Sequence, residues 1–349
     1  MLSLQGSAIS MGRNYGRQLK EEINANLKVL IQREGHGPLP WHERHFREWL
    51  CRQEHLLQRE WPWLLQEMSG VAQGCGAGYE DILLLNLRAW QYDLYSQPPA
   101  GGCSSLAVTL ADGTRACAGA LDDPARYYCG PVHFEPDEGY GFITFPITGT
   151  SWGNRGMNSR GLSLGISSQR LPGLNILPGS INQDLALRII LQTCATAEEV
   201  REFCRKYHFT INLLCLDAQG DIFCAHQTAA GLFEIPTPDG WSALTNHIGN
   251  KDITDRLMKL GVREFPESAT TRARYDRLLR FAQRNNGRCT AEQVMEFIGR
   301  RDDNDPGSIH NGGTVCLTFS IPQNSSQTLW IMQTEGSDEE KRFFEPYIV

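Results

Sequence analysis

The order of helical and strand blocks constrains the fold of this chain more than any other feature. Apolar residues recur at helical spacing through residues 10–95, and from Cys103 the pattern changes to short strands joined by tight turns. Helices predicted over 184–191 and 197–207 separate a first block of strands from a second. A helical stretch at 271–300 then precedes two closing strands. This order predicts antiparallel sheets with helices on their outer faces, an α+β layered domain.

Length and composition indicate a globular chain with a substantial core. The 349 residues are 41% hydrophobic and 21% charged, which excludes disordered and fibrous classes. Neither repeats nor a low-complexity linker divide the sequence. We therefore expect one domain, in which residues 1–102 form a mainly helical flank and residues 103–349 carry both blocks of strands.

Charge and the ends of the chain bear on partners and location. The net charge of -7 argues against nucleic acid or an anionic membrane as the main partner. No apolar run approaches the roughly 20 residues that span a bilayer. The first residues lack the basic start and apolar stretch of a signal peptide, so we expect a cytoplasmic protein.

The eleven cysteines form neither C-x-x-C pairs nor zinc-like clusters, so we expect no metal site and mostly reduced, buried thiols. Cys215, Cys224 and Cys316 lie in apolar runs and fit this expectation. The segment His42-Glu43-Arg44-His45 spaces its histidines by three rather than four residues, which favours a solvated helix surface.

Cys103 differs from the other cysteines in its flanking residues, Gly101-Gly102 before it and two serines after it. One interpretation is a tight turn with a buried thiol. The other is cleavage of the Gly102–Cys103 bond, since an N-terminal cysteine carries a nucleophile and an amine of pKa about 7.7–8.0 that can act as its base. Asn246, at a predicted strand end, is a candidate oxyanion donor, although asparagine there commonly caps a turn.

Seven motifs in order give the chain a family resemblance over nearly its whole length. It resembles the acyl-coenzyme A:6-aminopenicillanic acid acyltransferase (isopenicillin N acyltransferase) family, which are cysteine members of the N-terminal-nucleophile hydrolases. The motifs are Met11-Gly12-Arg13-Asn14-Tyr15-Gly16, Gly70-Val71-Ala72-Gln73-Gly74, Leu85-Asn86-Leu87-Arg88, Gly102-Cys103-Ser104-Ser105, Gly156-Met157-Asn158-Ser159-Arg160-Gly161, Ala186-Leu187-Arg188-Ile189 and Thr245-Asn246-His247.

The resemblance implies a four-layer αββα fold, made as a zymogen that cleaves itself between Gly102 and Cys103 into a heterodimer. Cys103 would hold an acyl group as a thioester, and Asn246 would stabilise the oxyanion. The implied enzyme is an acyltransferase or amide hydrolase of secondary metabolism, acting on a small amide or peptide-derived metabolite. It implies no cofactor, with acyl-coenzyme A or an amine as a candidate co-substrate.

The sequence departs from the family pattern at two places. Where the resemblance implies an aspartate near the nucleophile, Asp123 fits by spacing and Asp122 is the second choice, while a turn aspartate is an equal alternative. His310 stands where a cysteine followed by an arginine is implied, and the neutral Asn311 is nearest to that arginine, which argues against a penicillin substrate. Asp122, Arg274 and His310 are the substrate-binding candidates. Arg274 matches a family helix, and we favour a structural role for it.

Two other functions are compatible with the sequence. The first is a thiol hydrolase that works without cleavage, with His247 or His310 as the base for Cys103. The second is a catalytically inactive binding protein that has kept the fold, which the altered segment Leu121-Asp122-Asp123 favours.

Overall fold

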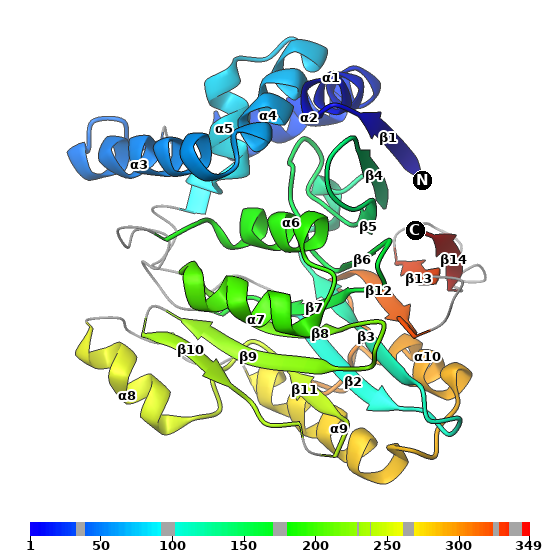
Figure 1. Cartoon of the computed structure of the whole chain (residues 1–349). Helices are drawn as coiled ribbons and strands as arrows, with labels where there is room; N and C mark the ends of the chain where they lie inside the picture. Colours follow the sequence, from blue (N-terminus) through cyan, green and yellow to red (C-terminus); the bar gives the residue numbers. More distant parts are fainter. Residues whose placement is uncertain are drawn as a thin grey trace.

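The computed structural model of the chain describes residues 1–32, 39–91, 102–169, 180–228, 230–237, 239–260, 269–323, 328–334 and 344–349. Within these ranges, eight strands form one sheet and six form a second (Figure 1). The larger sheet pairs its strands antiparallel except for β1 beside β4. Its strands, in spatial order, are β1 (Leu2–Gly6), β4 (Val132–Pro136), β5 (Phe142–Thr144), β6 (Gly156–Asn158), β7 (Ser163–Ser167), β8 (Ile211–Leu216), β9 (Ile222–Thr228) and β10 (Gly231–Glu234).

The second sheet is antiparallel throughout its described strands, and Cys103 lies directly before one of its interior strands, β2 (Ser104–Thr109). A β-bulge interrupts the register between Thr314 and Cys316, opposite the end of β3. Its strands, in spatial order, are β11 (Ser242–Leu244), β2 (Ser104–Thr109), β3 (Arg115–Asp122), β12 (Thr314–Ser320), β13 (Thr328–Gln333) and β14 (Glu345–Ile348).

The two sheets pack face to face, with helices on both outer faces. Ser105 Oγ on β2 donates a hydrogen bond of 3.2 Å to the Ile166 carbonyl on β7, which joins the sheets. Helices α6 (Gln183–Thr193) and α7 (Ala197–Lys206) cover the larger sheet, and α9 (Ala269–Asn285) and α10 (Ala291–Gly299) cover the smaller one (Figure 1). The predicted four-layer αββα arrangement is confirmed.

The N-terminal segment packs as a helical layer at one end of the larger sheet (Figure 1). Helices α1 (Ala8–Gln18) and α4 (Pro62–Cys75) touch backbone to backbone. A Cβ on Gly12 would lie 2.0 Å from the Glu67 carbonyl oxygen, and one on Gly70 would lie 2.3 Å from that of Ile9. Small residues in the first and second motifs therefore serve helix packing. The segment holds α1 (Ala8–Gln18), α2 (Lys20–Asn26), α3 (Arg44–Glu60), α4 (Pro62–Cys75) and α5 (Tyr79–Asn86).

Strand β1 is the main departure from the predicted helical flank. Its five residues pair parallel with β4, so the N-terminal segment supplies an edge strand of the larger sheet. A strand of this length gives a weak sequence signal, because its hydrogen-bond partners lie about 130 residues further along the chain. Helix α8 (Lys251–Lys259), beside β10, also went unpredicted.

Local signals set several helix ends as expected. Thr196 and Glu199 form a reciprocal capping box at the start of α7. A second box, Thr290 with Gln293, starts α10 and divides the predicted helical stretch 271–300 in two.

Cys215, Cys224 and Cys316 are buried free thiols, as predicted, and His42 and His45 are exposed, as expected of a solvated surface. Within the described ranges, no helix combines the length and apolar character needed to cross a membrane.

Candidate active site

Cys103 lies directly before β2, between the two sheets. Its residue is 5% exposed, and Leu121, Ile143, Phe145 and Met157 belong to the same apolar cluster. Gly102 is buried beside it, whereas Gly101 lies outside the described residues. The thiol therefore sits in a region from which neighbouring side chains exclude most water.

Arg274 of α9 connects the backbone at Cys103 with Asn246. It is 1% exposed, and its Nη1 donates to the Cys103 carbonyl oxygen at 2.5 Å and to Ser104 Oγ at 2.8 Å. Its Nη2 donates to Asn246 Oδ1 at 3.0 Å. From sequence we favoured a structural role for Arg274, and that interpretation did not place it beside Cys103 and Asn246.

The Gly102 α-carbon packs against these two side chains. A Cβ at this position would lie 2.1 Å from Arg274 Nη2 and 2.6 Å from Asn246 Oδ1, well inside van der Waals contact. Because both side chains are buried and hydrogen-bonded, they have little freedom to withdraw. The residue before Cys103 thus has to be glycine for this arrangement to form.

Asn246, directly after Leu244 and Thr245 at the end of β11, is fixed by several hydrogen bonds. Its backbone N–H donates to Thr271 Oγ1 at 3.1 Å, and its Nδ2 donates to the Ser168 carbonyl at 2.9 Å. An amide nitrogen carries two hydrogens, so the Ser168 contact uses only one of them. The arrangement can orient an amide donor at an oxyanion, the role predicted for Asn246.

A buried network supports the strand end that carries Asn246. Asn212 Nδ2 donates to the Thr245 carbonyl at 2.7 Å and to the His247 carbonyl at 3.3 Å. The Nδ1 of His226 lies 2.7 Å from Asn212 Oδ1. Burial, followed by the charge of His247, lowers the pKa of His226 to about 4, so its imidazole is neutral at pH 7.

Of the two candidate aspartates, Asp122 lies beside Cys103. It ends β3, and its carboxylate accepts from Thr314 Oγ1 at 2.8 Å and from Asn311 Nδ2 at 3.1 Å. Burial raises its pKa, which the Arg274 guanidinium, the two hydrogen bonds and Arg155 partly offset. Asn311, the residue nearest the implied arginine, therefore contacts this carboxylate through a neutral amide.

Asp123, the first choice from spacing, belongs to a different cluster. Its Oδ2 accepts from the Tyr128 hydroxyl at 2.6 Å, and burial raises its pKa while Arg88 lowers it. Arg88 in turn pairs with Asp184 at 2.5 Å. Successive residues at the end of a strand point in opposite directions, so only one of two adjacent aspartates can face the thiol. The structure thus places the Asp122 carboxylate, and not that of Asp123, among the groups around Cys103, while the catalytic role of either aspartate stays a prediction.

The charged groups around the Cys103 thiol act in opposite directions. Burial is the largest influence and raises the pKa of Cys103. The Arg155 and Arg274 guanidinium groups lower this pKa, as does the backbone N–H of Asp122, whereas the Asp122 carboxylate raises it. The net effect is a pKa above the ordinary thiol value, so activation requires a base or a further positive influence.

Arg155 was missed from sequence. It lies directly before β6, inside the connection between two strands, and is 1% exposed. Its Nη2 donates to the Ser104 carbonyl at 2.5 Å and to Ser105 Oγ at 2.9 Å, immediately after the nucleophile. The available signal was a lone arginine in an otherwise uncharged stretch that borders the fifth motif.

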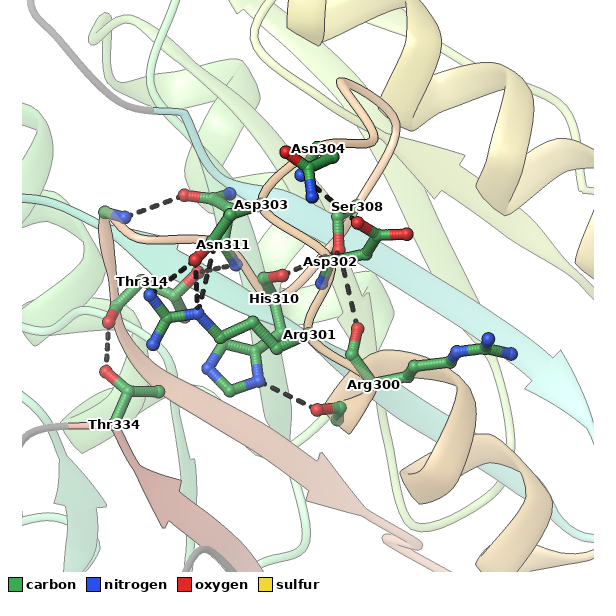
Figure 2. A network of polar contacts seen from close by, with 12 residues as sticks. Arg300, Arg301, Asp302, Asp303, Asn304, Ser308, His310, Asn311, Thr314 and Thr334 are labelled. Atoms are coloured by element: carbon green, nitrogen blue, oxygen red, sulfur yellow. Dashed lines mark hydrogen bonds and ion pairs between the residues drawn. The ribbon is translucent and has the colours of Figure 1, made fainter. Parts of the chain in front are cut away.

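The expected substrate-binding residue His310 faces a separate cavity of about 530 Å³. Figure 2 shows the network there, in which His310 Nδ1 lies 2.8 Å from the Gly299 carbonyl and Arg301 pairs with Asp303. Asn311, in the same loop, reaches from this network to Asp122. The described lining residues, which do not include Cys103, are Gly299, Arg301, Asp302, Asp303, Asn304, His310 and Met332.

The rings of the two alternative bases contact groups other than the thiol. His247 Nδ1 lies 3.1 Å from Thr245 Oγ1 and 3.2 Å from Thr271 Oγ1, and its ring packs edge-on against Tyr275. His310 contacts Gly299, as above. Neither histidine is among the groups that shift the pKa of Cys103.

The family described as acyl-coenzyme A:6-aminopenicillanic acid acyl-transferase matches residues 123–312, a range that begins downstream of Cys103. Curated proteins give no significant match.

Among solved structures, a variant of the conjugated bile acid hydrolase from Clostridium perfringens is 13% identical, with a TM-score of 0.49 over 70% of this chain and 92% of that one. The N-acylethanolamine-hydrolyzing acid amidase ortholog of Caenorhabditis elegans is 16% identical, with a TM-score of 0.44 over 64% and 94%.

Proposed function

The chain belongs to the acyl-coenzyme A:6-aminopenicillanic acid acyl-transferase family, and from this premise we propose a self-cleaving cysteine enzyme that processes a small amide. Family membership places it among acyltransferases and amide hydrolases of the N-terminal-nucleophile type. Our proposal adds autoproteolysis at Gly102–Cys103, an acyl-thioester on Cys103 and the substrate class.

The observation that carries the proposal is the packing of Gly102 against Arg274 and Asn246. A single peptide bond is bordered by a thiol on one side and by two buried, hydrogen-bonded polar side chains on the other. Arg274 holds the Cys103 carbonyl, so the backbone on the downstream side of that bond is fixed. Such positioning favours attack by the thiol on the carbonyl that precedes it.

In the proposed cleavage, Cys103 Sγ attacks the Gly102 carbonyl carbon. The C–S bond forms, the Gly102–Cys103 C–N bond breaks, and the thiol proton ends on the released amine. Asp122 is the carboxylate positioned to carry that proton, because its charge acts on the thiol and its pKa is raised. Water then hydrolyses the thioester, which leaves a carboxylate on Gly102 and restores the thiol.

In the proposed turnover, the new α-amine of Cys103 serves as the base for its own thiol. Attack on a substrate amide forms the acyl-thioester and expels the substrate amine, which takes up the proton. The second Nδ2 hydrogen of Asn246 stabilises the oxyanion. Water or an amine acceptor then releases the acyl group, which gives hydrolysis or transfer.

We propose an amino-acid conjugate or a peptide-derived metabolite as the substrate. The neutral contact of Asn311 with Asp122, where the family resemblance implies an arginine, supports a substrate other than a penicillin precursor. The two fragments would remain a heterodimer, because Glu67 and Arg88 of the first pair with Arg188 and Asp184 of the second.

Intact-protein mass spectrometry of the wild type beside Cys103→Ala tests the proposal. We expect the wild type to give two fragments, roughly one third and two thirds of 39.2 kDa, the larger beginning at Cys103. Cys103→Ala should give one chain, and Cys117→Ala, which removes another buried thiol, should still be cleaved. A wild type that stays intact while it turns over an amide would refute autoproteolysis.

A second assay separates transfer from hydrolysis. A candidate amide is incubated with and without an added amine, and the products are identified by mass. Formation of the exchanged amide indicates transfer, and free acid in both reactions indicates hydrolysis. If neither product forms with a wild type that is cleaved, the substrate class that we propose is wrong.

A further inference from the structure

Arg155 is a buried cation whose hydrogen-bonding capacity is only partly used. Its Nη2 donates to the carbonyl oxygens of Ser104 and Ile166, at 2.5 and 2.6 Å, and to Ser105 Oγ. Ser104 and Ser105 lie on β2 and Ile166 lies on β7, so one nitrogen joins the two sheets beside the nucleophile. Within the described residues, its Nε and Nη1 are buried and have no hydrogen-bond partner.

The fold reserves space for this guanidinium. Gly119 of β3 pairs with Ser105 of β2, and a Cβ on Gly119 would lie 2.4 Å from Arg155 Nη1. The glycine therefore leaves room between the sheets for a side chain that enters from the connection before β6. Burying an unpaired charge is unfavourable. The burial of Arg155 therefore indicates that its charge has a role at this place.

No carboxylate within the described residues forms an ion pair with Arg155. Arg155 lowers the pKa of Asp122, whose two oxygens accept hydrogen bonds from Thr314 and Asn311.

Three buried thiols in this region, those of Cys103, Cys117 and Cys316, have their pKa lowered by the charge of Arg155. Burial raises the pKa of Cys117 and of Cys316 to about 12, whereas Cys103 lies one residue upstream of the carbonyl that Arg155 holds. The unpartnered N–H groups of Arg155 and the Cys103 thiol, which can supply its countercharge, thus lie in the same region.

We propose that Arg155 is a positioning residue for the nucleophile, one that fixes the strand behind Cys103 and supplies the positive charge that favours its thiolate. This deepens the proposed function, since it assigns the means by which the same thiol is activated. The test reads the thiol directly and does not require turnover.

The charges facing the thiol come from four elements. Arg155 lies before β6, Asp122 ends β3, Arg274 comes from α9, and Cys316 of β12 is a further thiol close enough to interact with Cys103. Arg155 and Arg274 both lower the pKa of Cys103, and the Asp122 carboxylate raises it. Neutralising Arg155 should therefore move the thiol midpoint upward.

The experiment titrates Cys103 by ¹³C NMR in full-length protein labelled at the cysteine Cβ, with the Cys103 signal identified by its loss in Cys103→Ser. Arg155→Gln keeps a side chain that can donate to the Ser104 carbonyl but removes the charge. We expect its midpoint to rise by about one pH unit or more. Arg155→Lys, which keeps the charge, should stay within about half a unit of the wild type.

Arg160→Gln is the matched control, because it removes one positive charge from an exposed position on the same hairpin and should leave the midpoint unchanged. Circular dichroism verifies that each variant is folded. An unchanged midpoint in folded Arg155→Gln overturns the proposal, as does an equal rise in Arg155→Lys, which would indicate geometry rather than charge.

Intact mass establishes which form of each protein is titrated, so that like forms are compared. If only the wild type is cleaved, the cleavage rate of Arg155→Gln is followed against pH. Recovery of at least tenfold between pH 7 and pH 9 supports the proposal, and a rate that stays low overturns it. If no protein is cleaved, the proposed autoproteolysis fails, while the titration of uncleaved chains still decides the role of Arg155.

Discussion

Arg188 and Arg155 are both completely buried, yet they have opposite surroundings. Arg188 of α6 pairs with Glu67 of α4 at 2.8 Å and lies over the rings of Phe142 and Phe134, 4.3 and 4.9 Å from their centroids. Its charge is balanced where it stands. Arg155 donates to carbonyl and hydroxyl oxygens and has no acidic partner in the described chain.

From this difference we infer that Arg188 stabilises the fold, whereas Arg155 acts on the candidate site. Arg188 has its countercharge in the resting protein, and this ion pair joins the N-terminal segment to the sheet that α6 covers. Arg155 gains a countercharge only when another group becomes negative. Substitutions at the two places should therefore affect different measurements.

The largest effect is expected on the structural side, from Glu67→Gln. It leaves Arg188 buried without a countercharge and should lower the free energy of unfolding by about 3–5 kcal/mol. Urea denaturation measures this loss, with the exposed Glu80→Gln as control. Below the unfolding transition, cleavage at Cys103 should be unchanged. A loss under about 1 kcal/mol would contradict the role that we assign to the pair.

Gly102→Ala should have the reverse pattern. Its Cβ would overlap Arg274 and Asn246, so we expect cleavage at least about a hundredfold slower, equivalent to about 2.7 kcal/mol, with a smaller loss of stability than in Glu67→Gln. Intact mass against time gives the rate. Gly249→Ala is the control, because the nearest atom to its Cβ would be 3.9 Å away. Wild-type cleavage in Gly102→Ala would remove the main support for autoproteolysis.

The buried network that supports Asn246 should make the free energy of unfolding decrease in acid. The pKa of His226 is lowered to about 4 in the folded state from 6.5, so the unfolded chain binds this proton first as pH falls. The stability it contributes is present above pH 6.5 and is lost on the way to pH 4. From pH 7 to pH 5 the wild type should lose about 2 kcal/mol relative to His226→Gln. Parallel urea midpoints for the two proteins would contradict this.

The smallest effect distinguishes the two adjacent aspartates. Asp122→Asn removes the carboxylate beside the thiol and should slow cleavage about tenfold, equivalent to about 1.4 kcal/mol. Asp123→Asn, whose side chain contacts Tyr128, should change the rate less than about twofold. Cleavage rates by intact mass compare them directly, and a larger effect at Asp123 would restore the choice made from spacing.

Sequence reasoning located most elements and the centre of the candidate site. Periodicity and turn residues predicted the β2–β3 hairpin, α6, α7 and the closing strands, because these signals lie within a few residues of each other. The flanks of Cys103 and the position of Asn246 at a strand end were likewise visible in short stretches. Their assigned roles stay predictions.

Only the folded chain revealed strand β1, the place of Asp122 beside the thiol, and the two arginines of the candidate site, Arg155 and Arg274. Arg274 reaches the Cys103 carbonyl across 171 residues, and Arg155 reaches Ser104 across 51. Which of two neighbouring aspartates faces the thiol depends on strand register, and a shift of one residue exchanges them. The sequence alone determined which local elements form and which thiol follows two glycines at the start of a strand. Packing between distant segments chose the charges around it, because burial and opposing partners exist only once the layers have come together.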